Sequence, residues 1–142
     1  MIMKSNTDIQ ARLMLKAAKL YCTECRVAIL KVLLKADEPL RQDQFAQRLG
    51  KNRLNKVTIY RTLEAFCRAE LVHRAFLRKR AGYFELANRC GPIRCHPHFT
   101  CQNCGETHCL IGLSVPVVKG LKKGFIIRRQ QVWLEGLCPA CG

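Results

Sequence analysis

Apolar residues spaced by three and four positions predict four helices in the first half of the chain. Thr7, Thr23 and Asn55 can cap three of these helices, and residues 42–49 form a shorter one that Gly50 ends. The residues expected to face the core are Ile9, Leu13, Ala17, Leu20, Val27, Leu30, Leu34, Phe45, Leu49, Ile59, Leu63 and Phe66.

Two β-like runs follow the fourth helix, at residues 71–77 and 83–86, and a basic tip at residues 78–82 separates them. Helices followed by such a hairpin predict a winged helix, a variant of the helix-turn-helix. In that fold the helix before the hairpin enters the major groove of DNA, and the tip touches the backbone or the minor groove. Residues 1–88 are therefore expected to form a DNA-binding domain.

The charge of the chain is unevenly distributed. Its 25 Lys and Arg against 10 Asp and Glu give a formal net charge of +15, which favours a surface that faces a polyanion. The excess concentrates between Arg41 and Arg80, where the predicted DNA-binding elements lie. Merely solvated charge is the alternative, but the order of the elements favours DNA binding. The residues expected to contact DNA are Lys56, Thr58, Tyr60, Arg61, Arg78, Lys79 and Arg80.

The second half, residues 89–142, reads as a small α+β domain. Strands are predicted at 98–101, 107–111 and 125–134, and a helix at 114–124 begins at Ser114 with Pro116 in its first turn. A unit of this size has little core, so a structural metal ion is a natural stabiliser. Apolar residues make up 49% of the whole chain, which suffices for a core. No signal peptide or membrane-spanning run is evident, so a cytoplasmic protein without a membrane partner is expected.

Ten cysteines in such a protein indicate metal or redox chemistry more than a disulfide framework. Cys101 and Cys104 form one Cys-x-x-Cys, and Cys138 and Cys141 form a second near the end of the chain. Each pair can bind one metal ion from both sides of a turn, and four thiolates suffice for a closed tetrahedral zinc site. One structural zinc ion bound by these four residues is therefore predicted. Two separate redox dithiols are the alternative.

Further cysteines and histidines suggest a second, regulatory metal site with ligands from both halves of the chain. Its candidate ligands are His73, Cys90, His96, His98 and Cys109. His96 and His98 point the same way if their segment is extended. A bound ion there could fix the angle between DNA-binding arms. Equally open are a polar edge-strand role for His73 and a core role for Cys109.

Other cysteines have weaker indications. Cys95 could replace Cys90 as a ligand. Cys22 and Cys25 form a third Cys-x-x-Cys at a helix start, where a structural role is favoured and a thiol switch is the alternative.

Three motifs carry a resemblance to a known family. Residues 57–63 (VTIYRTL) resemble the T-V-Y-R-x-L recognition helix of the ferric uptake regulator family, and residues 71–74 (LVHR) resemble its first wing strand. The run from His96 through Gly105, with the distant Gly-x-Cys-x-x-Cys, resembles its metal-binding dimerisation domain. This resemblance implies a metal-dependent homodimeric repressor that binds palindromic operators in double-stranded DNA.

The same resemblance bears on the regulatory ligands. His96 and His98 match the family's His-x-His ligands, and His73 matches a histidine of zinc-sensing members. Cys90 falls where members have a carboxylate or a thiol, and Cys109 falls where they usually have Asp or Glu.

Thiolates with few nearby carboxylates favour zinc over iron as the regulatory ion. A zinc-responsive regulator of uptake genes, with one structural and one regulatory zinc ion per chain, is therefore expected. An iron-responsive or peroxide-sensing repressor is the alternative within the family. A thiol oxidoreductase and a zinc-storage protein are more distant alternatives. A zinc hydrolase is disfavoured because no Glu stands at a general-base spacing from the His-x-His.

Overall fold

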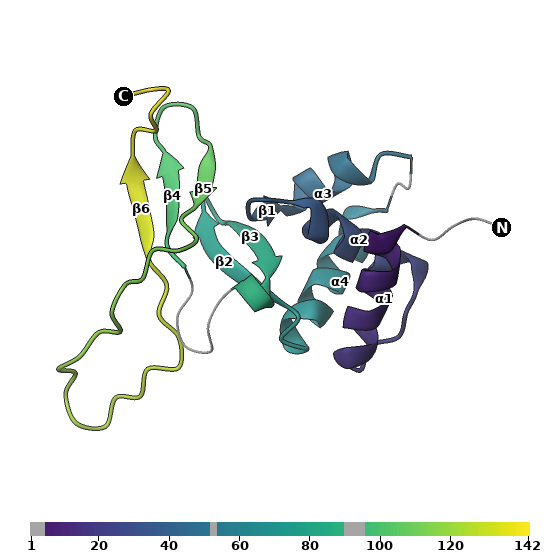
Figure 1. The fold of residues 1–142 in the computed structure, drawn as a ribbon, viewed down its shortest axis with the longest axis horizontal. Coiled ribbons are helices and arrows are strands. Elements are labelled where there is room, and N and C mark those ends of the chain that lie inside the picture. The colour runs from purple at the N-terminus through teal and green to yellow at the C-terminus, as the bar shows by residue number, and fades with distance from the viewer. Residues whose placement is uncertain (1–4, 52–53, 90–95) are drawn as a thin grey trace. The chain divides into compact units, whose positions relative to one another are not determined.

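The computed structural model describes residues 5–51, 54–89 and 96–142. The chain divides into two compact units, Met1–Ala87 and Asn88–Gly142, and the secondary structure is mixed α+β (Figure 1). None of the described helices is long and apolar enough to cross a membrane.

The first unit is built on four helices, α1 (Asn6–Ala17), α2 (Glu24–Lys35), α3 (Gln42–Leu49) and α4 (Lys56–Arg68). The side chains of Thr23 and Asn55 cap α2 and α4 as predicted, because each accepts a hydrogen bond from a backbone N–H in the first turn. The cap of α1 is Ser5, two residues before the predicted Thr7. Gly50 follows α3 in a left-handed conformation, with φ +55°.

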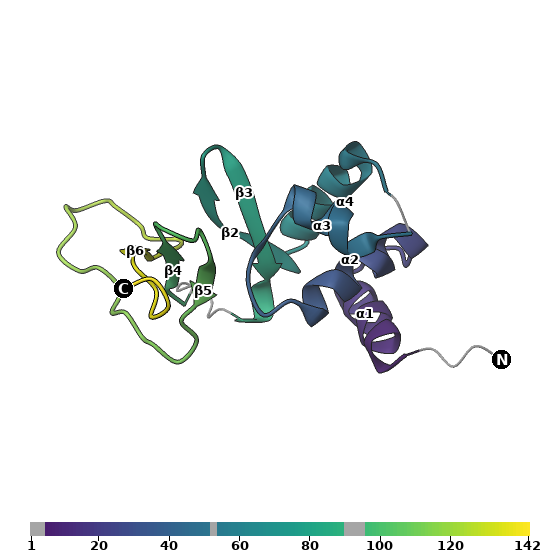
Figure 2. The ribbon, with the colours of Figure 1, turned by 90° about the horizontal axis from the view of Figure 1, so that it is seen from above.

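A three-stranded antiparallel sheet completes this unit (Figure 2). Its order is β1 (Leu40–Arg41), β3 (Ala81–Leu86), β2 (Val72–Arg78), and a single 3₁₀ turn at Ala87–Arg89 follows it. The strands β2 and β3 form the predicted hairpin, with Arg78 paired to Ala81, so the turn between them has only two residues. The short strand β1 was not predicted.

Side chains from all four helices and from the sheet form one apolar core. Its fully buried members include Leu15, Leu30, Phe45, Leu63 and Phe66. Most predicted inward positions of α2, α3 and α4 are buried; Leu34 is only half-buried.

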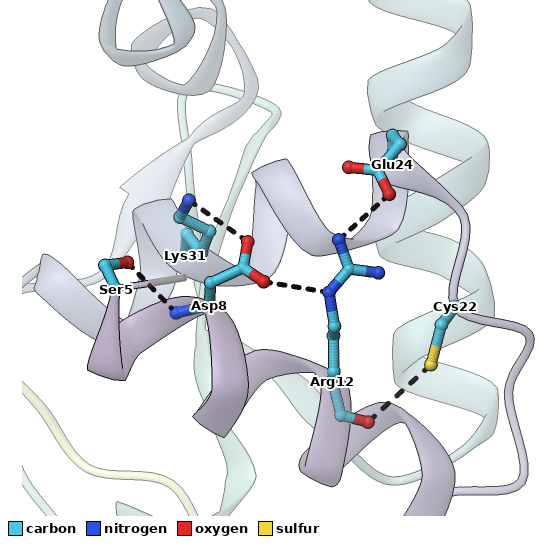
Figure 3. Close-up of polar contacts among 6 residues, drawn as sticks. All are labelled: Ser5, Asp8, Arg12, Cys22, Glu24 and Lys31. Carbon is cyan, nitrogen blue, oxygen red and sulfur yellow. Dashed lines mark hydrogen bonds and ion pairs between the residues drawn. The ribbon is translucent and has the colours of Figure 1, made fainter. Parts of the chain in front are cut away.

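The predicted buried face of α1 is wrong. Ile9 and Leu13 are 49% and 61% exposed, whereas Asp8, Ala11 and Leu15 are buried. The reason is an ion-pair network between α1 and α2 (Figure 3). The Asp8 carboxylate accepts hydrogen bonds from Arg12 Nε at 2.8 Å and from Lys31 Nζ at 3.4 Å, and these two cations make its burial tolerable.

The second unit contains a three-stranded sheet in the order β5 (Thr107–Cys109), β4 (His98–Cys101), β6 (Trp133–Gly136). The strand β5 pairs antiparallel to β4, whereas β6 runs parallel to it. The structure confirms 98–101 as a strand, but the strand predicted at 107–111 ends at Cys109.

A long loop replaces the helix predicted at 114–124 and most of the strand predicted at 125–134 (Figure 1). Gly120 and Gly124 lie in the left-handed region, with φ of +80° and +96°, and β-branched valines surround Pro116, so the local preference for helix is low. The Gln130 side chain holds the loop instead, accepting from Val118 N at 2.7 Å and donating to Pro116 O at 2.9 Å.

Candidate metal centre and nucleic-acid interface

The second unit brings the two Cys-x-x-Cys pairs together at one end of its sheet. Cys101 ends β4, and the parallel pairing of β4 with β6 places it opposite Gly136, just before the second pair. Cys104 lies in the turn after β4, where the N–H of Gly105 donates to Cys101 O at 3.0 Å. Each pair therefore lies where a strand ends and a tight turn begins, at the same end of the sheet.

The four sulfur atoms have the spacing that a metal ion requires. All lie within 4.8 Å of one another, and Cys104 Sγ lies 3.8 Å from Cys138 Sγ. A tetrahedral zinc site with Zn–S bonds of about 2.3 Å has sulfurs about 3.8 Å apart. Cys101 and Cys138 are buried, while Cys104 is exposed. Donor type, number and spacing all fit zinc, and the residues that would hold it are the predicted four.

Backbone groups favour the ionised form of one of these thiols. The N–H groups of Cys138 and Cys104 lower the pKa of the Cys101 thiol to about 6. The N–H of Glu106 also favours a Cys104 thiolate, but hydrogen bonds to neighbouring sulfurs, first that of Cys101, and burial raise the pKa of Cys104 to about 12. Burial likewise raises the pKa of Cys138. Four adjacent thiols resist full ionisation until a cation supplies positive charge, so metal binding would release protons.

A second group of metal-ligand side chains lies on the other part of the same sheet. His98 in β4 pairs in register with Cys109 in β5, and the rings of His96 and His98 lie 4.5 Å apart between centroids. One ligand atom of each of the three residues lies within 4.8 Å of the others. Both histidines are largely buried. Two imidazoles and one thiol can bind zinc while leaving a coordination position open.

The predicted ligand His73 belongs to the first unit and has a carboxylate partner there. His73 in β2 pairs across the hairpin with Glu85 in β3, and its Nε2 lies 2.7 Å from Glu85 Oε1, with both side chains buried. This contact fixes the orientation of the imidazole ring. The predictions for Cys90 and Cys95 lie outside the described residues.

The Cys22 and Cys25 pair is not part of a metal-ligand group among the described residues. Cys22 Sγ donates a weak hydrogen bond to Arg12 O at 3.6 Å (Figure 3), and its side chain packs partly against the core. These contacts fit the favoured structural role.

The helix α4 presents a polar, basic face to solvent. Ile59 and Leu63 are buried, so the opposite side of the helix exposes Lys56, Tyr60 and Arg61, and Tyr60 is 48% exposed. Thr58, another residue expected to contact DNA, is half-buried.

A hollow of about 450 Å³ lies between the start of α4, the start of α3 and the hairpin. Of the predicted DNA-contacting residues, Lys56, Tyr60 and Arg80 line this hollow. Lys79 is exposed at the hairpin turn, and the side chain of Arg78 lies outside what the structure describes.

Two arginines in this hollow were not predicted as site residues. Arg41 precedes α3 and lies over the ring of Tyr83 at 6.0 Å, and Arg74 of β2 lies over the ring of Phe84 at 5.5 Å. Both come from strands whose pairing, and not their sequence, places them beside α4. The only sequence signal for these two arginines is that each pairs with an aromatic residue in an adjacent strand. This signal can be read only when the strand register is known.

Comparison with known proteins assigns the fold. The model of the ferric uptake regulator family matches residues 17–115. The solved structure of the Vibrio cholerae ferric uptake regulator is 22% identical, with a TM-score of 0.65 over 89% of this chain and 98% of that one. A zinc uptake regulator complexed with zinc and DNA is 20% identical, with a TM-score of 0.62 over 96% and 95%. A zinc-bound manganese uptake regulator is 18% identical, with a TM-score of 0.64 over 90% and 98%. No curated protein sequence is significantly similar to this chain.

Proposed function

The chain belongs to the ferric uptake regulator family, whose members are metal-binding transcriptional regulators and not enzymes, and on this basis we propose that it is a zinc-responsive repressor. In this proposal a homodimer binds palindromic operators in double-stranded DNA and controls metal-uptake genes. The observation that carries the choice of zinc is the donor set of the second unit. Its two ligand groups contain five thiols and two imidazoles, and the soft thiolates favour zinc over iron or manganese.

The first unit supplies the DNA-binding surface in this proposal. Its four helices followed by the β2–β3 hairpin have the element order of a winged helix, in which α4 would enter the major groove. The exposed Tyr60 and Arg61 would reach base edges, and Lys56 with the hairpin turn would contact phosphates. The basic lining of the hollow supports this assignment.

The second unit supplies a dimer interface and two zinc sites. It exposes many large apolar side chains, and burial against a second copy would remove them from water. They are Ile111, Leu113, Val118, Leu121, Phe125, Ile126, Trp133, Leu134 and Leu137. The four thiols would bind the structural ion, because a closed four-sulfur site offers no open position to a cellular competitor.

The regulatory ion would bind His96, His98 and Cys109, because one ligand atom of each lies within 4.8 Å of the others. A regulatory ion must bind better to one arrangement of the protein than to another. We therefore retain the sequence-based proposal that His73 and Cys90 contribute ligands from the preceding part of the chain. If His73 binds metal through Nδ1, Glu85 on Nε2 would fix its tautomer, because a carboxylate that accepts from the other ring nitrogen holds a metal-bound imidazole in place.

The test compares two histidines of the second unit, His96 just before β4 and His108 in β5. His96→Ala should keep the dimer and one zinc ion per chain but lose the zinc-stimulated rise in operator affinity, measured by fluorescence anisotropy with anaerobic zinc, iron(II) and manganese titrations. His108→Ala is the matched control, because His108 is 44% exposed in β5 and lies outside the proposed ligand set.

Three outcomes would contradict the proposal. An unchanged zinc response in His96→Ala would place the regulatory site elsewhere. Stimulation of the parent by iron(II) but not by zinc would refute the choice of metal. Zinc binding without preference for any DNA sequence would favour a storage protein over a regulator.

A further inference from the structure

The hairpin turn has a backbone conformation that its residues do not favour. Lys79 and Arg80 have φ of +47° and +67°, and with Arg78 paired to Ala81 they are the two central residues of the turn. Positive φ at both positions is the type I′ arrangement, which strongly prefers Asn-Gly. A side chain with a Cβ is disfavoured there, and both residues are exposed, so burial does not compensate. A backbone outlier of this kind points to function.

Contacts below the turn direct a second arginine toward the hollow. Arg74 lies over the ring of Phe84 and donates to Glu64 Oε1 at 3.2 Å. A Cβ at Gly82 would meet Arg74 Nε at 3.1 Å and Phe84 Cε2 at 3.3 Å. Glycine at this position therefore leaves the space in which the guanidinium stacks on the ring.

Hydrogen bonds and an ion pair also fix the opposite wall of the hollow, at the starts of α3 and α4. Gln42 Nε2 donates to Lys56 O at 2.5 Å, which ties the start of α3 to the start of α4. Arg41 pairs with Asp43 at 3.0 Å. No described residue accepts a hydrogen bond from Arg41 Nε, although this atom is buried.

The lining of the hollow is therefore suited to an anion. Four of its residues are cations, and one is an acid. The cations are Arg41, Lys56, Arg74 and Arg80, and the acid is Asp43.

We propose that this hollow binds one phosphate group of the DNA backbone, contacted by Arg41 and Arg80, and that the disfavoured turn is retained because it places Arg80 there. The inference rests on the proposed function, since it assumes that α4 faces DNA. Arg41 becomes a further DNA-contacting residue, and a guanidinium suits a phosphate because its N–H groups form a planar fork. At this turn, residues that improve DNA affinity would then lower the stability of the fold.

The experiment measures both quantities in matched variants of the zinc-loaded protein. The DNA is a duplex that the parent selects from a random pool. The double variant Lys79→Asn/Arg80→Gly should melt at a higher temperature than the parent, because Asn-Gly suits the turn. Its affinity for the duplex should fall. The slope of the logarithm of the binding constant against the logarithm of the salt concentration should become less steep by about 0.9 for each phosphate that the variant no longer neutralises. The charge-matched control Lys16→Gln/Lys35→Gln replaces two exposed helix residues and should show neither change.

A second measurement tests the phosphate directly. In single methylphosphonate substitutions along the duplex, which remove one negative charge each, one position in each half-site should weaken binding of the parent but not of Arg41→Gln. The inference would be overturned if no methylphosphonate substitution weakened binding of the parent. It would also be overturned if every substitution that weakens binding of the parent weakened binding of Arg41→Gln as well. A double variant that binds with the parent's affinity and salt slope would overturn the role of the turn. If the parent selects no duplex at all, the proposed function itself fails.

Discussion

Loss of one zinc thiol should unfold the second unit and leave the first intact. Among the described residues, the first unit has a core of sixteen buried residues in one cluster, whereas the buried apolar residues of the second are Pro97, Cys101 and Cys138. Without a metal ion the second unit has almost no apolar core, and small units of this kind depend on such an ion. Structural zinc sites contribute on the order of 10 kcal/mol to folding, which exceeds what a unit of this size can supply otherwise.

Cys104→Ser is the variant that isolates this contribution. The Cys104 side chain is exposed, so replacing its sulfur with oxygen leaves no cavity in the protein and acts only through the metal. In protein purified without added zinc, where only the tight structural site should be filled, we expect the variant to lose this one zinc ion per chain, measured by inductively coupled plasma mass spectrometry. In amide hydrogen exchange, residues of β4 and β6 should lose protection while residues of α2 and α4 keep theirs.

Cys25→Ser is the matched control. Cys25 also belongs to a Cys-x-x-Cys but lies in α2 of the first unit, outside any metal-ligand group among the described residues. This variant should keep its zinc and the exchange pattern of the parent. If Cys104→Ser retains the metal and the protection of β4, the four-thiol site is wrong and the second unit must be stabilised in another way.

Two further predictions concern the first unit. Arg12, with Lys31, lowers the pKa of the Asp8 carboxyl below 3.8, so its ionised form stabilises the fold above about pH 4, and this contribution disappears as pH falls through the lower, folded-state pKa. Asp8→Asn should therefore lower the melting temperature more at pH 7 than at pH 2, and an equal decrease at both values would refute the ion-pair account. Tyr60→Ala should weaken operator binding by about 1–3 kcal/mol if Tyr60 reaches a base edge, and the melting temperature should not change because Tyr60 is exposed. Retained affinity would exclude the proposed placement of α4.

The helices of the first unit could be predicted because local and tertiary requirements agree there. In α4 the cap Asn55, the apolar spacing of Ile59 and Leu63 and the basic exposed face all indicate the same boundaries and the same orientation. In α1 they disagree. Asp8 is buried through ion pairs with residues four and twenty-three positions away, and apolar periodicity does not report such pairs.

Strand register shows a different limit. The hairpin shifts register between Arg74 and Phe76, where β2 has an irregularity. With the register of the turn continued, His73 would oppose Leu86; the shift places it opposite Glu85. The one extra residue in β2 thus decides whether His73 has a carboxylate partner. No residue type in the sequence indicates where this register shift occurs.

The cluster of four sulfur atoms could be predicted because the spacing of its cysteines in the sequence is typical of metal-binding turns. A Cys-x-x-Cys in a tight turn can place two sulfurs on one ion, and the parallel pairing of β4 with β6 brings two such turns together. The loop between β5 and β6 has no comparable constraint. It is long, and its apolar residues, such as Leu121 in the predicted helix and Phe125 in the predicted strand, are exposed, so neither predicted element has a packing partner within the unit to stabilise it.

The two units obtain their stability from different sources, and this difference suits a metal-dependent regulator. The first unit has its own core and therefore keeps the α4 surface formed at any metal concentration. The second has thiols where a core would be, so in the proposed function its folding would require one ion that binds tightly and exchanges slowly. Regulation then requires a second ion with weaker binding, because an ion that is always bound cannot report its concentration. The proposed ligands His96, His98 and Cys109 would leave a coordination position open and would therefore meet that requirement better than the closed four-sulfur site. Removing zinc in two steps should accordingly abolish operator binding before it unfolds the second unit.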